Sequence, residues 1–395
     1  MRILLTTFTF APQANGVAEV VREQACGLAA RGHEVTVATL REPRRTSADT
    51  FGRLQIREFQ IGGLYASRGG YTGEVAAYQN FIEREPVDVM LFHGWQVWPT
   101  DLALAVAPRG AIKVLVSHGF DAQRWKRYPR FPWGLALWAR SFRYVLRTPR
   151  LLRRLDHVVF LSPRVDRERF FDHWLLQRFG GPDWSAIPNG CRPEQFPAAS
   201  PGFRQKHSLG ERFVVLCVGA YATNKNQAAA LRAFCAADLE AAVLVFIGHE
   251  LNDYARDLQT LAKTLMPPHA PTRVLFLERQ GRDAIREAYQ AADLVMVTSE
   301  GETQPLVLLD AMACGKPFLS TDVGCVSELP GAVVVRHESQ LPDALRSLHA
   351  DPASRATLAA AGQSAARTEY HWENILDRYD QLLRRLVTKP TGKIS

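Results

Sequence analysis

Two carboxylates eight positions apart, Glu302 and Asp310, are the residues of this chain whose type and spacing point most directly to chemistry. They flank a predicted strand-to-helix turn, so Glu302 is expected in the loop after the strand and Asp310 on the helix. Backbone N–H groups at the start of a helix are unpaired and carry partial positive charge. Together these groups could accept hydroxyls and hold a phosphate, a combination that a nucleotide sugar presents. The structural alternative is that Glu302 is a helix cap and Asp310 is solvated.

The elements around this pair follow from local patterns. Residues 292–299 form a short apolar run bounded by polar residues, which is typical of a buried parallel strand. A helix is predicted over 306–314, because Pro305 suits a first helical turn and Gly315 suits a C-cap.

Strands that alternate with helices recur along the chain and predict two α/β domains, each with helices on both faces of a parallel sheet. Open sheets of this kind bind ligands at the carboxyl ends of their strands. In the first half we expect a helix over 16–31 and strands at 3–6, 34–40, 88–93, 113–118 and 157–162. In the second half the expected strands are 213–219, 243–248, 273–277, 294–298, 317–320 and 332–335.

The length of 395 residues is too great for one core, so two domains are expected. Turn-forming residues around 187–196 place a linker from there to about residue 210. We therefore expect a Rossmann-like domain over 1–200 and a second one over 201–370. A terminal helix and tail over 371–395 should pack back towards the first domain.

The composition, 47% hydrophobic and 22% charged, is ordinary for a soluble enzyme. No run approaches the ~18 apolar residues that span a bilayer, and the N-terminus does not resemble a signal peptide. The cysteines form no C-x-x-C pair, which predicts buried free thiols in a reducing cytoplasm and argues against structural zinc. They are Cys26, Cys191, Cys217, Cys235, Cys314 and Cys325.

Basic residues are concentrated between Arg124 and Arg154, where ten stand without an acidic residue, whereas the whole chain carries a net charge of +8. This concentration indicates a local patch rather than a general nucleic-acid binder. Pro149 is predicted to begin a new helix and to interrupt a stripe formed by Arg140, Arg143, Arg147, Arg150 and Arg154. We hypothesise that the segment 124–154 docks on an anionic membrane surface. In the alternative, its apolar face packs on its own domain and the arginines are solvated.

The order and spacing of motifs over nearly the whole chain resemble the retaining glycosyltransferases of family 4. The resemblance implies an α/β fold of the GT-B type, with two Rossmann-like domains facing a central cleft. The motifs are Asn15-Gly-Val17, strands ending at His93 and His118, Ile187-Pro-Asn-Gly190, Val218-Gly-x5-Lys-Asn226, Glu302-x7-Asp310, Thr321-Asp-Val-Gly324 with Glu328, and His371-Trp-Glu373.

The resemblance also implies roles for the matching residues. Glu302 would hold the transferred sugar, Asp310 the ribose and Lys225 the departing diphosphate, while His118 would contact a sugar hydroxyl. His93 shares the local pattern of His118, but it matches a family position of less certain role. The remaining donor-binding positions would be Gly16, Gly219, Arg279, Pro305, Leu306 and Val307, and the acceptor-binding positions Asn15, Asp121 and Arg124.

Two positions depart from the family pattern. Asp310 replaces the usual second glutamate, which keeps the charge on a shorter side chain. Ala220 stands where the family carries an arginine beside Lys225 for the diphosphate. Either another basic residue, Arg279 or Lys316, substitutes for it, or donor binding is weak or specialised.

The resemblance implies a retaining hexosyltransferase that uses a nucleotide-diphosphate sugar and needs no cofactor. Its acceptor would be a glycan or lipid-linked molecule in bacterial cell-surface polysaccharide or lipopolysaccharide assembly, in the cytoplasm or at the inner leaflet of the plasma membrane. No Asp-x-Asp pair occurs, so no catalytic metal is expected. A non-catalytic protein that binds nucleotide or glycan is the main alternative, and a GT-B epimerase is a third. The absence of a G-x-G-x-x-G motif disfavours an NAD enzyme.

Overall fold

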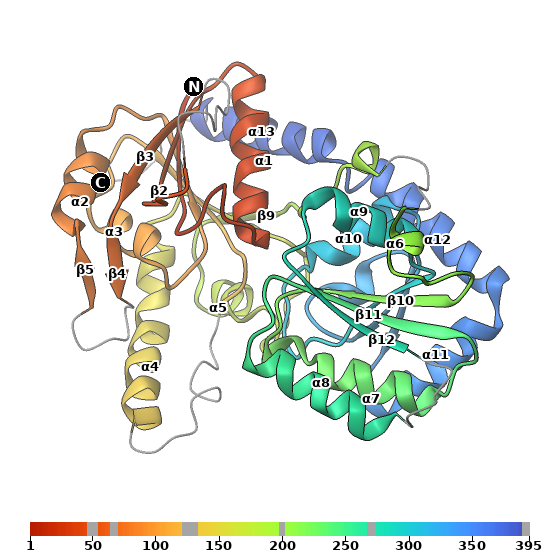
Figure 1. Ribbon diagram of the computed structural model, residues 1–395. Helices are drawn as coiled ribbons and strands as arrows, with labels where there is room; N and C mark the ends of the chain where they lie inside the picture. The colour runs from red at the N-terminus through yellow and green to blue at the C-terminus, as the bar shows by residue number, and fades with distance from the viewer. Residues whose placement is uncertain (46–53, 64–69, 121–132, 197–201, 267–272, 389–395) are drawn as a thin grey trace. The chain divides into compact units, whose positions relative to one another are not determined.

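A computed structural model describes residues 1–45, 54–63, 70–120, 133–196, 202–266 and 273–388. The chain divides into two compact units (Figure 1). The first unit comprises Met1–Asn189 together with Glu373–Ser395, and the second comprises Gly190–Trp372. The terminal helix therefore belongs to the first unit, and the second unit begins at Gly190 rather than at residue 201.

The first unit is built on a parallel sheet, which among the described residues has seven strands in the order β3-β2-β1-β6-β7-β8-β9. Its inner strands are buried apolar runs, as both faces of a parallel sheet are covered. A separate antiparallel pair joins β4 to β5. The strands are β1 (Arg2–Thr6), β2 (Glu34–Leu40), β3 (Gln55–Phe59), β4 (Ile61–Gly63), β5 (Tyr71–Gly73), β6 (Val89–His93), β7 (Ile112–Val116), β8 (His157–Phe160) and β9 (Asp183–Ala186).

Helices cover this sheet on both faces. One set of strand side chains, including Leu4, Phe92 and Leu115, forms a buried cluster with residues of α2, α3, α4 and α5. The alternate side chains, such as Leu5 and Leu91, are also fully buried. The helices of the unit are α1 (Gly16–Ala30), α2 (Val75–Arg84), α3 (Trp98–Val106), α4 (Trp133–Leu152), α5 (Phe171–Phe179) and the terminal α13 (Trp372–Thr388).

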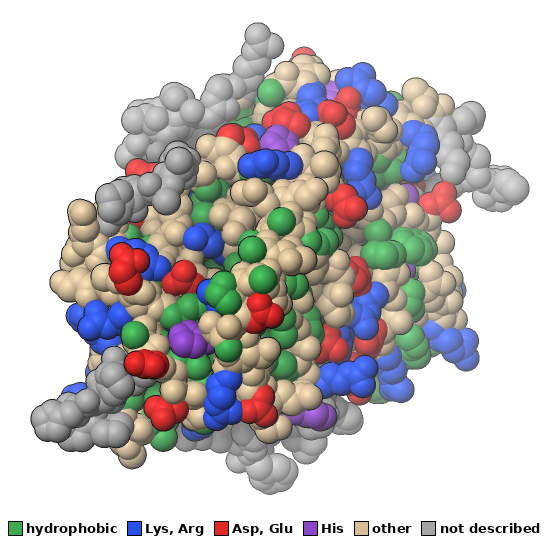
Figure 2. All heavy atoms as spheres, turned by 90° about the vertical axis from the view of Figure 1, so that its right-hand side faces the viewer, with side chains coloured by type: hydrophobic (Ala, Val, Ile, Leu, Met, Phe, Trp, Pro, Cys, Tyr) green, Lys and Arg blue, Asp and Glu red, His purple; other side chains and the backbone are tan. Residues whose placement is uncertain are grey.

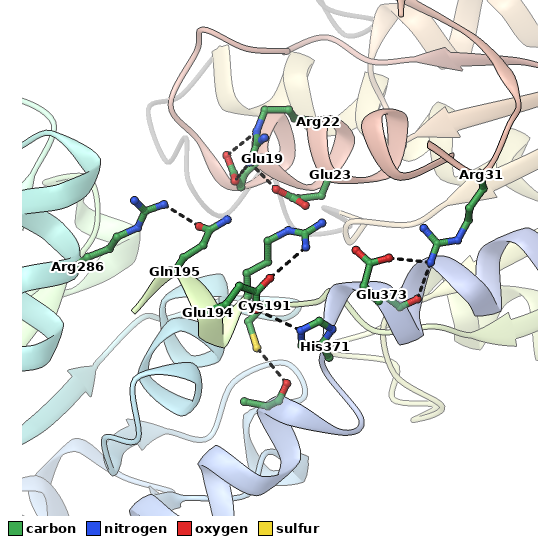
Figure 3. A network of polar contacts seen from close by, with 12 residues as sticks. Glu19, Arg22, Glu23, Arg31, Cys191, Glu194, Gln195, Arg286, His371 and Glu373 are labelled. Carbon is green, nitrogen blue, oxygen red and sulfur yellow. Dashed lines mark hydrogen bonds and ion pairs between the residues drawn. The ribbon is translucent and has the colours of Figure 1, made fainter. Parts of the chain in front are cut away.

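Helix α13 packs against α1. Arg31, at the end of α1, donates hydrogen bonds to the carboxylates of Glu373 at 3.0 Å and Asp377 at 2.6 Å (Figure 3 shows the first). Gly27 lies so close to Leu376 that an added Cβ would be 2.2 Å from the Cδ1 atom of that leucine. A small residue in α1 therefore allows α13 to complete the first unit.

Helix α4 continues through Pro149, so the predicted break there is wrong. A proline inside a helix removes one backbone hydrogen bond and costs about 3 kcal/mol. Here the proline lies in the last turn, between the buried residues Tyr144 and Leu152. Thr148 adds a hydrogen bond from Oγ1 to the carbonyl oxygen of Tyr144 at 3.0 Å. Burial on either side of the proline offsets its cost.

A half-buried carboxyl, Asp101 of α3, joins α4 to the β4–β5 pair. Tyr144 of α4 donates to its Oδ1 at 2.5 Å, and Tyr71 of β5 donates to its Oδ2 at 2.5 Å. Burial raises the pKa of Asp101 to about 6, although the two hydroxyls and the charge of Arg147 act in the opposite direction. The carboxyl therefore changes its charge within the range of ordinary assays.

This pKa predicts how the stability of the fold depends on pH. A carboxyl whose pKa is raised on folding stabilises the native state most when protonated, so its contribution is lost as pH rises from about 4 through 6. For a pKa raised from 3.8 to about 6, the loss is at most about 3 kcal/mol. We expect Asp101→Asn to gain stability relative to the wild type between pH 4.5 and pH 7.5. Urea unfolding at several pH values measures this difference, and a constant difference would contradict it.

The second unit contains a parallel sheet with the strand order β12-β11-β10-β13-β14-β15 in the described part of the chain. All six correspond to strands predicted from apolar runs. They are β10 (Phe213–Val218), β11 (Ala242–Gly248), β12 (Arg273–Glu278), β13 (Leu294–Val297), β14 (Phe318–Thr321) and β15 (Ala332–Val335).

Helices cover both faces of this sheet (Figure 1), and the side chains of each face belong to a separate buried cluster. Val214 and Leu216 of β10 face α6, α9, α10 and α12, whereas Val215 and Cys217 face α7, α8 and α11. This alternation follows from the period of two in a strand. The helices are α6 (Gly202–Lys206), α7 (Gln227–Ala237), α8 (Asp253–Leu265), α9 (Arg282–Ala291), α10 (Leu306–Ala313), α11 (Leu341–Ala350) and α12 (Pro352–Arg367).

The first and last residues of the second unit meet. Cys191 donates its backbone N–H to the carbonyl of Tyr370 at 2.7 Å and accepts from the N–H of Trp372 at 3.1 Å. Glu194 Oε2 lies 3.2 Å from His371 Nε2 (Figure 3). A Cβ on Gly190 would lie 2.7 Å from the indole of Trp372. Close packing of the indole thus accounts for a glycine at the end of Ile187-Pro-Asn-Gly190.

Candidate functional site

The loop between β13 and α10 carries Glu302 at the carboxyl edge of the second sheet. The strand ends at Val297, the helix begins at Leu306, and Pro305 is its N-cap in an extended conformation. The helix ends at Ala313 and is followed by Gly315 with a φ of +64°. Both predicted elements are present, and the helix is one residue shorter than expected.

Glu302 forms an ion pair with Lys225. The Nζ atom of Lys225 donates to Oε1 of Glu302 at 2.5 Å, and the Ser299 hydroxyl donates to the same oxygen at 2.8 Å. The side chain of Glu302 is only 14% exposed, whereas that of Lys225 is 33% exposed. The two residues assigned to sugar and diphosphate thus contact each other, within reach of solvent.

Strand order explains why these two residues meet. Strands β10 and β13 are neighbours, so the loops that follow them lie at the same edge of the sheet. Thr298 Oγ1 donates to the carbonyl of Asn226 at 2.8 Å, and the N–H of Glu300 donates to the carbonyl of Asn224 at 2.9 Å. The two loops are therefore hydrogen-bonded to each other on either side of the ion pair.

A third loop, after β14, supports the backbone of the Glu302 loop. The hydroxyl of Thr321 donates to the carbonyl of Ser299 at 2.9 Å, and the N–H of Cys325 donates to the carbonyl of Thr303 at 3.0 Å. Gly324 has a φ of +51°, and a Cβ there would lie 2.3 Å from the carbonyl oxygen of Thr303. This supporting role of Thr321-Asp-Val-Gly324 could not be predicted from the motif itself, in which the glycine is the one local signal.

Asp310 lies half-buried on α10, a little more than one turn from the start of the helix at Leu306. Burial and then the charge of Asp310 raise the pKa values of the Cys191 thiol and the Tyr289 hydroxyl. Tyr289 also donates to the carbonyl of Val307 at 3.1 Å, in the first turn of the same helix. Pro305 is buried at the start of the helix, while Leu306 and Val307 are half-buried.

The glycine turn after β10 leaves Ala220 exposed. The N–H of Gly219 bonds to the carbonyl of Ile247 at 2.9 Å, and the carbonyl of Ala220 accepts from Gln227 at 2.8 Å. Only a methyl group extends from the position at which the family has its arginine. The exposure of Ala220 means that a longer side chain would meet solvent there.

Of the two candidates to replace that arginine, Lys316 is wrong. It precedes β14, so it lies at the amino edge of the sheet, where its Nζ donates to the carbonyl of Gln290 at 2.8 Å. Arg279 follows β12 at the carboxyl edge and its side chain is 75% exposed. Arg279 therefore remains the candidate.

In the first unit, Asn15 and Gly16 lie at the start of α1. Asn15 is the N-cap, because its Oδ1 accepts from the N–H of Ala18 at 3.0 Å. Its amide donates to the hydroxyl of Thr9 at 2.7 Å. The side chain assigned to the acceptor thus has an established structural role. Asp121 and Arg124, the other residues assigned to the acceptor, lie outside the described residues.

The two strand-end histidines contact each other. His93 ends β6, and His118 follows the adjacent strand β7. His93 Nδ1 lies 3.0 Å from His118 Nε2, and the ring centroids are 5.3 Å apart with the ring planes inclined by 21°. Burial lowers the pKa of His118 to about 4 and that of His93 well below its usual value. Both imidazoles are therefore neutral at physiological pH.

In the part of the chain that the structure describes, no group of three His, Cys, Asp or Glu side chains is placed so that it could bind a metal ion. None of the six cysteines, all of which lie in the described residues, forms a disulfide, and each is buried or half-buried.

Several solved structures of known proteins share the fold of this chain over nearly its whole length. Sucrose-phosphate synthase from Thermosynechococcus elongatus matches with a TM-score of 0.78 at 20% identity over 98% of both chains. HepE of Anabaena, solved with UDP-glucose, matches with a TM-score of 0.74 at 17% identity over 98% of this chain and all of that one. WaaG, a glycosyltransferase involved in lipopolysaccharide biosynthesis, matches with a TM-score of 0.71 at 19% identity over 96% and 99%. The fold is GT-B.

Sequence comparison gives the family. Residues 14–195 match the family described as Glycosyltransferase Family 4, and residues 212–351 match the one described as Glycosyl transferases group 1. The chain belongs to glycosyltransferase family 4. Among curated relatives, the D-inositol 3-phosphate glycosyltransferase of Rhodococcus opacus is 37% identical over 111 residues. That match spans 27% of this chain and only 25% of the relative.

Proposed function

We propose that this protein is a retaining glycosyltransferase that moves a sugar from a nucleotide-diphosphate donor to a hydroxyl of a glycan or lipid-linked acceptor. The observation that supports the proposal most directly is the cluster of Lys225, Glu302 and Ser299 at the carboxyl edge of the second sheet. It combines a cation for a diphosphate with a carboxylate for sugar hydroxyls. Family membership supports the same assignment.

In the proposed reaction, Lys225 neutralises the charge that develops on the departing diphosphate. Glu302 orients the sugar, Asp310 binds the ribose, and His118 contacts a sugar hydroxyl. The leaving diphosphate assists attack by the acceptor from the same face, so configuration is retained without a protein nucleophile. For the setting we propose bacterial cell-surface polysaccharide or lipopolysaccharide assembly in the cytoplasm, in line with the involvement of WaaG in lipopolysaccharide biosynthesis.

A donor screen tests this proposal. UDP-, GDP-, ADP- and TDP-sugars are compared for thermal stabilisation, since a ligand at 100-fold its Kd adds about 2.7 kcal/mol. Stabilising donors are then assayed for slow hydrolysis and transfer, with and without EDTA. We expect one nucleotide class to stabilise the protein and to be turned over, with turnover unaffected by EDTA. Loss of turnover on chelation, restored by Mg²⁺ or Mn²⁺, would contradict the metal-independent mechanism.

The exposed Ala220 is the observation that favours the alternative, a non-catalytic protein that binds nucleotide or glycan. Restoring the family's cation separates the two functions. We expect Ala220→Arg to lower the KM for the donor roughly 10-fold, because a hydrogen bond to a charged group is worth about 1.5–3 kcal/mol. Ala220→Gln, which has similar length and no charge, is the matched control. If neither the wild type nor either variant turns over a donor, the result would favour the non-catalytic protein that binds nucleotide or glycan.

We also propose that α4 docks the first unit on an anionic membrane surface. The apolar side chains Phe142 and Leu146 are 48% and 62% exposed, next to the exposed arginines Arg143, Arg147 and Arg150. The side chain of Arg140 lies outside the described part. By contrast, basic and acidic side chains are interspersed on the face drawn in Figure 2. Within the described ranges every helix is too short or too polar to cross a membrane.

Sedimentation with phosphatidylcholine vesicles, with and without phosphatidylglycerol, tests the docking. Attraction is about 1 kcal/mol for each basic residue near such a surface, so Arg143→Glu with Arg150→Glu should weaken binding by more than about 10-fold. The matched control reverses two exposed arginines elsewhere in the unit, Arg57 and Arg84. Equal binding by the two double variants, or no binding to anionic vesicles at low salt, would exclude the membrane role.

A further inference from the structure

The strongest unassigned feature is His93, a fully buried imidazole beside His118. His93 is 0% exposed, and its Nε2 has no hydrogen-bond partner among the residues that the structure describes. Its other nitrogen, Nδ1, lies 3.0 Å from His118 Nε2. Glycines with φ of +91° and +102°, Gly94 and Gly119, follow the two histidines and turn the chain away from adjacent strands. The same local geometry thus places both rings at the carboxyl edge of the first sheet.

The unpartnered nitrogen determines which ring donates. A neutral imidazole has one N–H and one lone pair. If His118 donated through Nε2, His93 would carry its own proton on Nε2, where a buried N–H would have no acceptor. If His93 donates through Nδ1, only a lone pair is left unpaired. An orphaned buried N–H is the rarer and costlier case. The favoured arrangement is therefore donation from His93 Nδ1 to His118 Nε2.

This arrangement fixes the tautomer of His118. With Nε2 acting as the acceptor, the proton of the neutral His118 ring must be on Nδ1. The contact also restrains rotation of the ring, because a hydrogen bond between two nearly coplanar rings depends on their orientation. His93 is too deeply buried to touch a substrate itself.

We propose that His93 is a positioning residue for the glycosyl transfer, because it holds His118 in the Nδ1–H tautomer and in a fixed orientation towards the donor sugar. This inference rests on the proposed function for the role of His118. It assigns to His93 a part in turnover that acts through the neighbouring ring.

Two substitutions separate positioning from packing. His93→Asn keeps an N–H donor close to the place of Nδ1 but leaves a cavity, so it should lower the stability. His93→Phe fills the volume of the imidazole ring and removes the unpaired nitrogen, so the variant should be as stable as the wild type. It lacks the N–H that His93 donates to His118. We expect His93→Phe to lower kcat about 10-fold or more, by analogy with the loss when partners that orient metal-ligating histidines are removed, with little change in the donor KM. His93→Asn should retain most of the wild-type kcat despite a lower Tm.

If His93 serves only to pack the core, activity should follow Tm, and His93→Phe should be more active than His93→Asn. That result would overturn the proposal. A second readout does not depend on activity. In ¹⁵N-histidine spectra of the full-length protein, we expect His118 to be protonated on Nδ1 in the wild type and in His93→Asn. In His93→Phe we expect this preference for the Nδ1–H tautomer to be lost. His118 protonated on Nε2 in the wild type would disprove the inference even if glycosyl transfer is confirmed. If no donor is turned over, the proposed function fails while the tautomer remains measurable.

Discussion

Replacing Glu302 by glutamine should reduce sugar transfer by at least about 100-fold, comparable to the loss of one charged or preorganised group at a reacting centre. As the diphosphate departs, positive charge develops on the sugar, and the Glu302 carboxylate in a largely buried position would stabilise it. Glutamine preserves the shape and the hydrogen bond from Ser299 but removes the charge. Steady-state kinetics with the donor identified by the screen measures the effect.

The ion pair with Lys225 gives this variant a second signature. In the unliganded protein the cation is bound to Glu302, so a diphosphate must compete with that carboxylate. The nucleoside diphosphate should therefore bind Glu302→Gln at least as tightly as the wild type, even though turnover falls. Glu300→Gln, an exposed position in the same loop, is the matched control. If both variants keep wild-type turnover, Glu302 has no role in the reaction.

Lys225→Met should lower both turnover and nucleotide affinity, unlike the change at Glu302. Loss of a group that stabilises developing negative charge costs about 3–4 kcal/mol, or roughly 100- to 1,000-fold in kcat. The effect should be near the upper end of this range, because Ala220 provides no second cation beside Lys225. Single-turnover kinetics and calorimetric titration with the nucleoside diphosphate separate the two losses.

Lys263→Met is the control for this prediction, since Lys263 is an exposed residue of α8 in the same unit. The two site residues should also be coupled. Because Glu302 and Lys225 share a direct ion pair, the double variant should lose less activity than the product of the single losses. Full multiplicative losses, or unchanged diphosphate affinity in Lys225→Met, would contradict the assigned role of the lysine.

The inner strands of both sheets could be predicted from the sequence, whereas β3 and β9 could not. Buried parallel strands are nearly continuous apolar runs, and a run such as 213–218 is evident without any tertiary information. Strands β3 and β9 are the two edges of the first sheet and are partly exposed. Their polar residues, as in Gln55–Phe59, remove the signal. At Pro149 the local signal was strong but misleading. The sequence predicted a new helix there, whereas burial of the neighbouring residues keeps α4 continuous.

The sequence could place Lys225 and Glu302 in loops after strands, but it could not show that they form an ion pair. That contact depends on β10 and β13 being neighbours, although β11 and β12 lie between them along the chain. Lys316 is excluded by its position just before β14, at the amino edge of the parallel sheet, which the predicted strand over 317–320 already implies. The resemblance to family 4 supplied residue roles, whereas the hydrogen bonds that support the Glu302 loop required the structure.

The division of the first unit into two chain segments has a consequence for the order in which the protein is made. During synthesis, residues 1–189 emerge early, whereas α13, the helix that completes their unit, follows the entire second unit along the chain. The second unit is continuous and can fold as soon as residue 372 is available. Until α13 is available, the α1 surface around Gly27 lacks its partner Leu376, which is fully buried in the finished protein. In this chain the N-terminal unit is therefore the last to be completed, the reverse of the usual vectorial order.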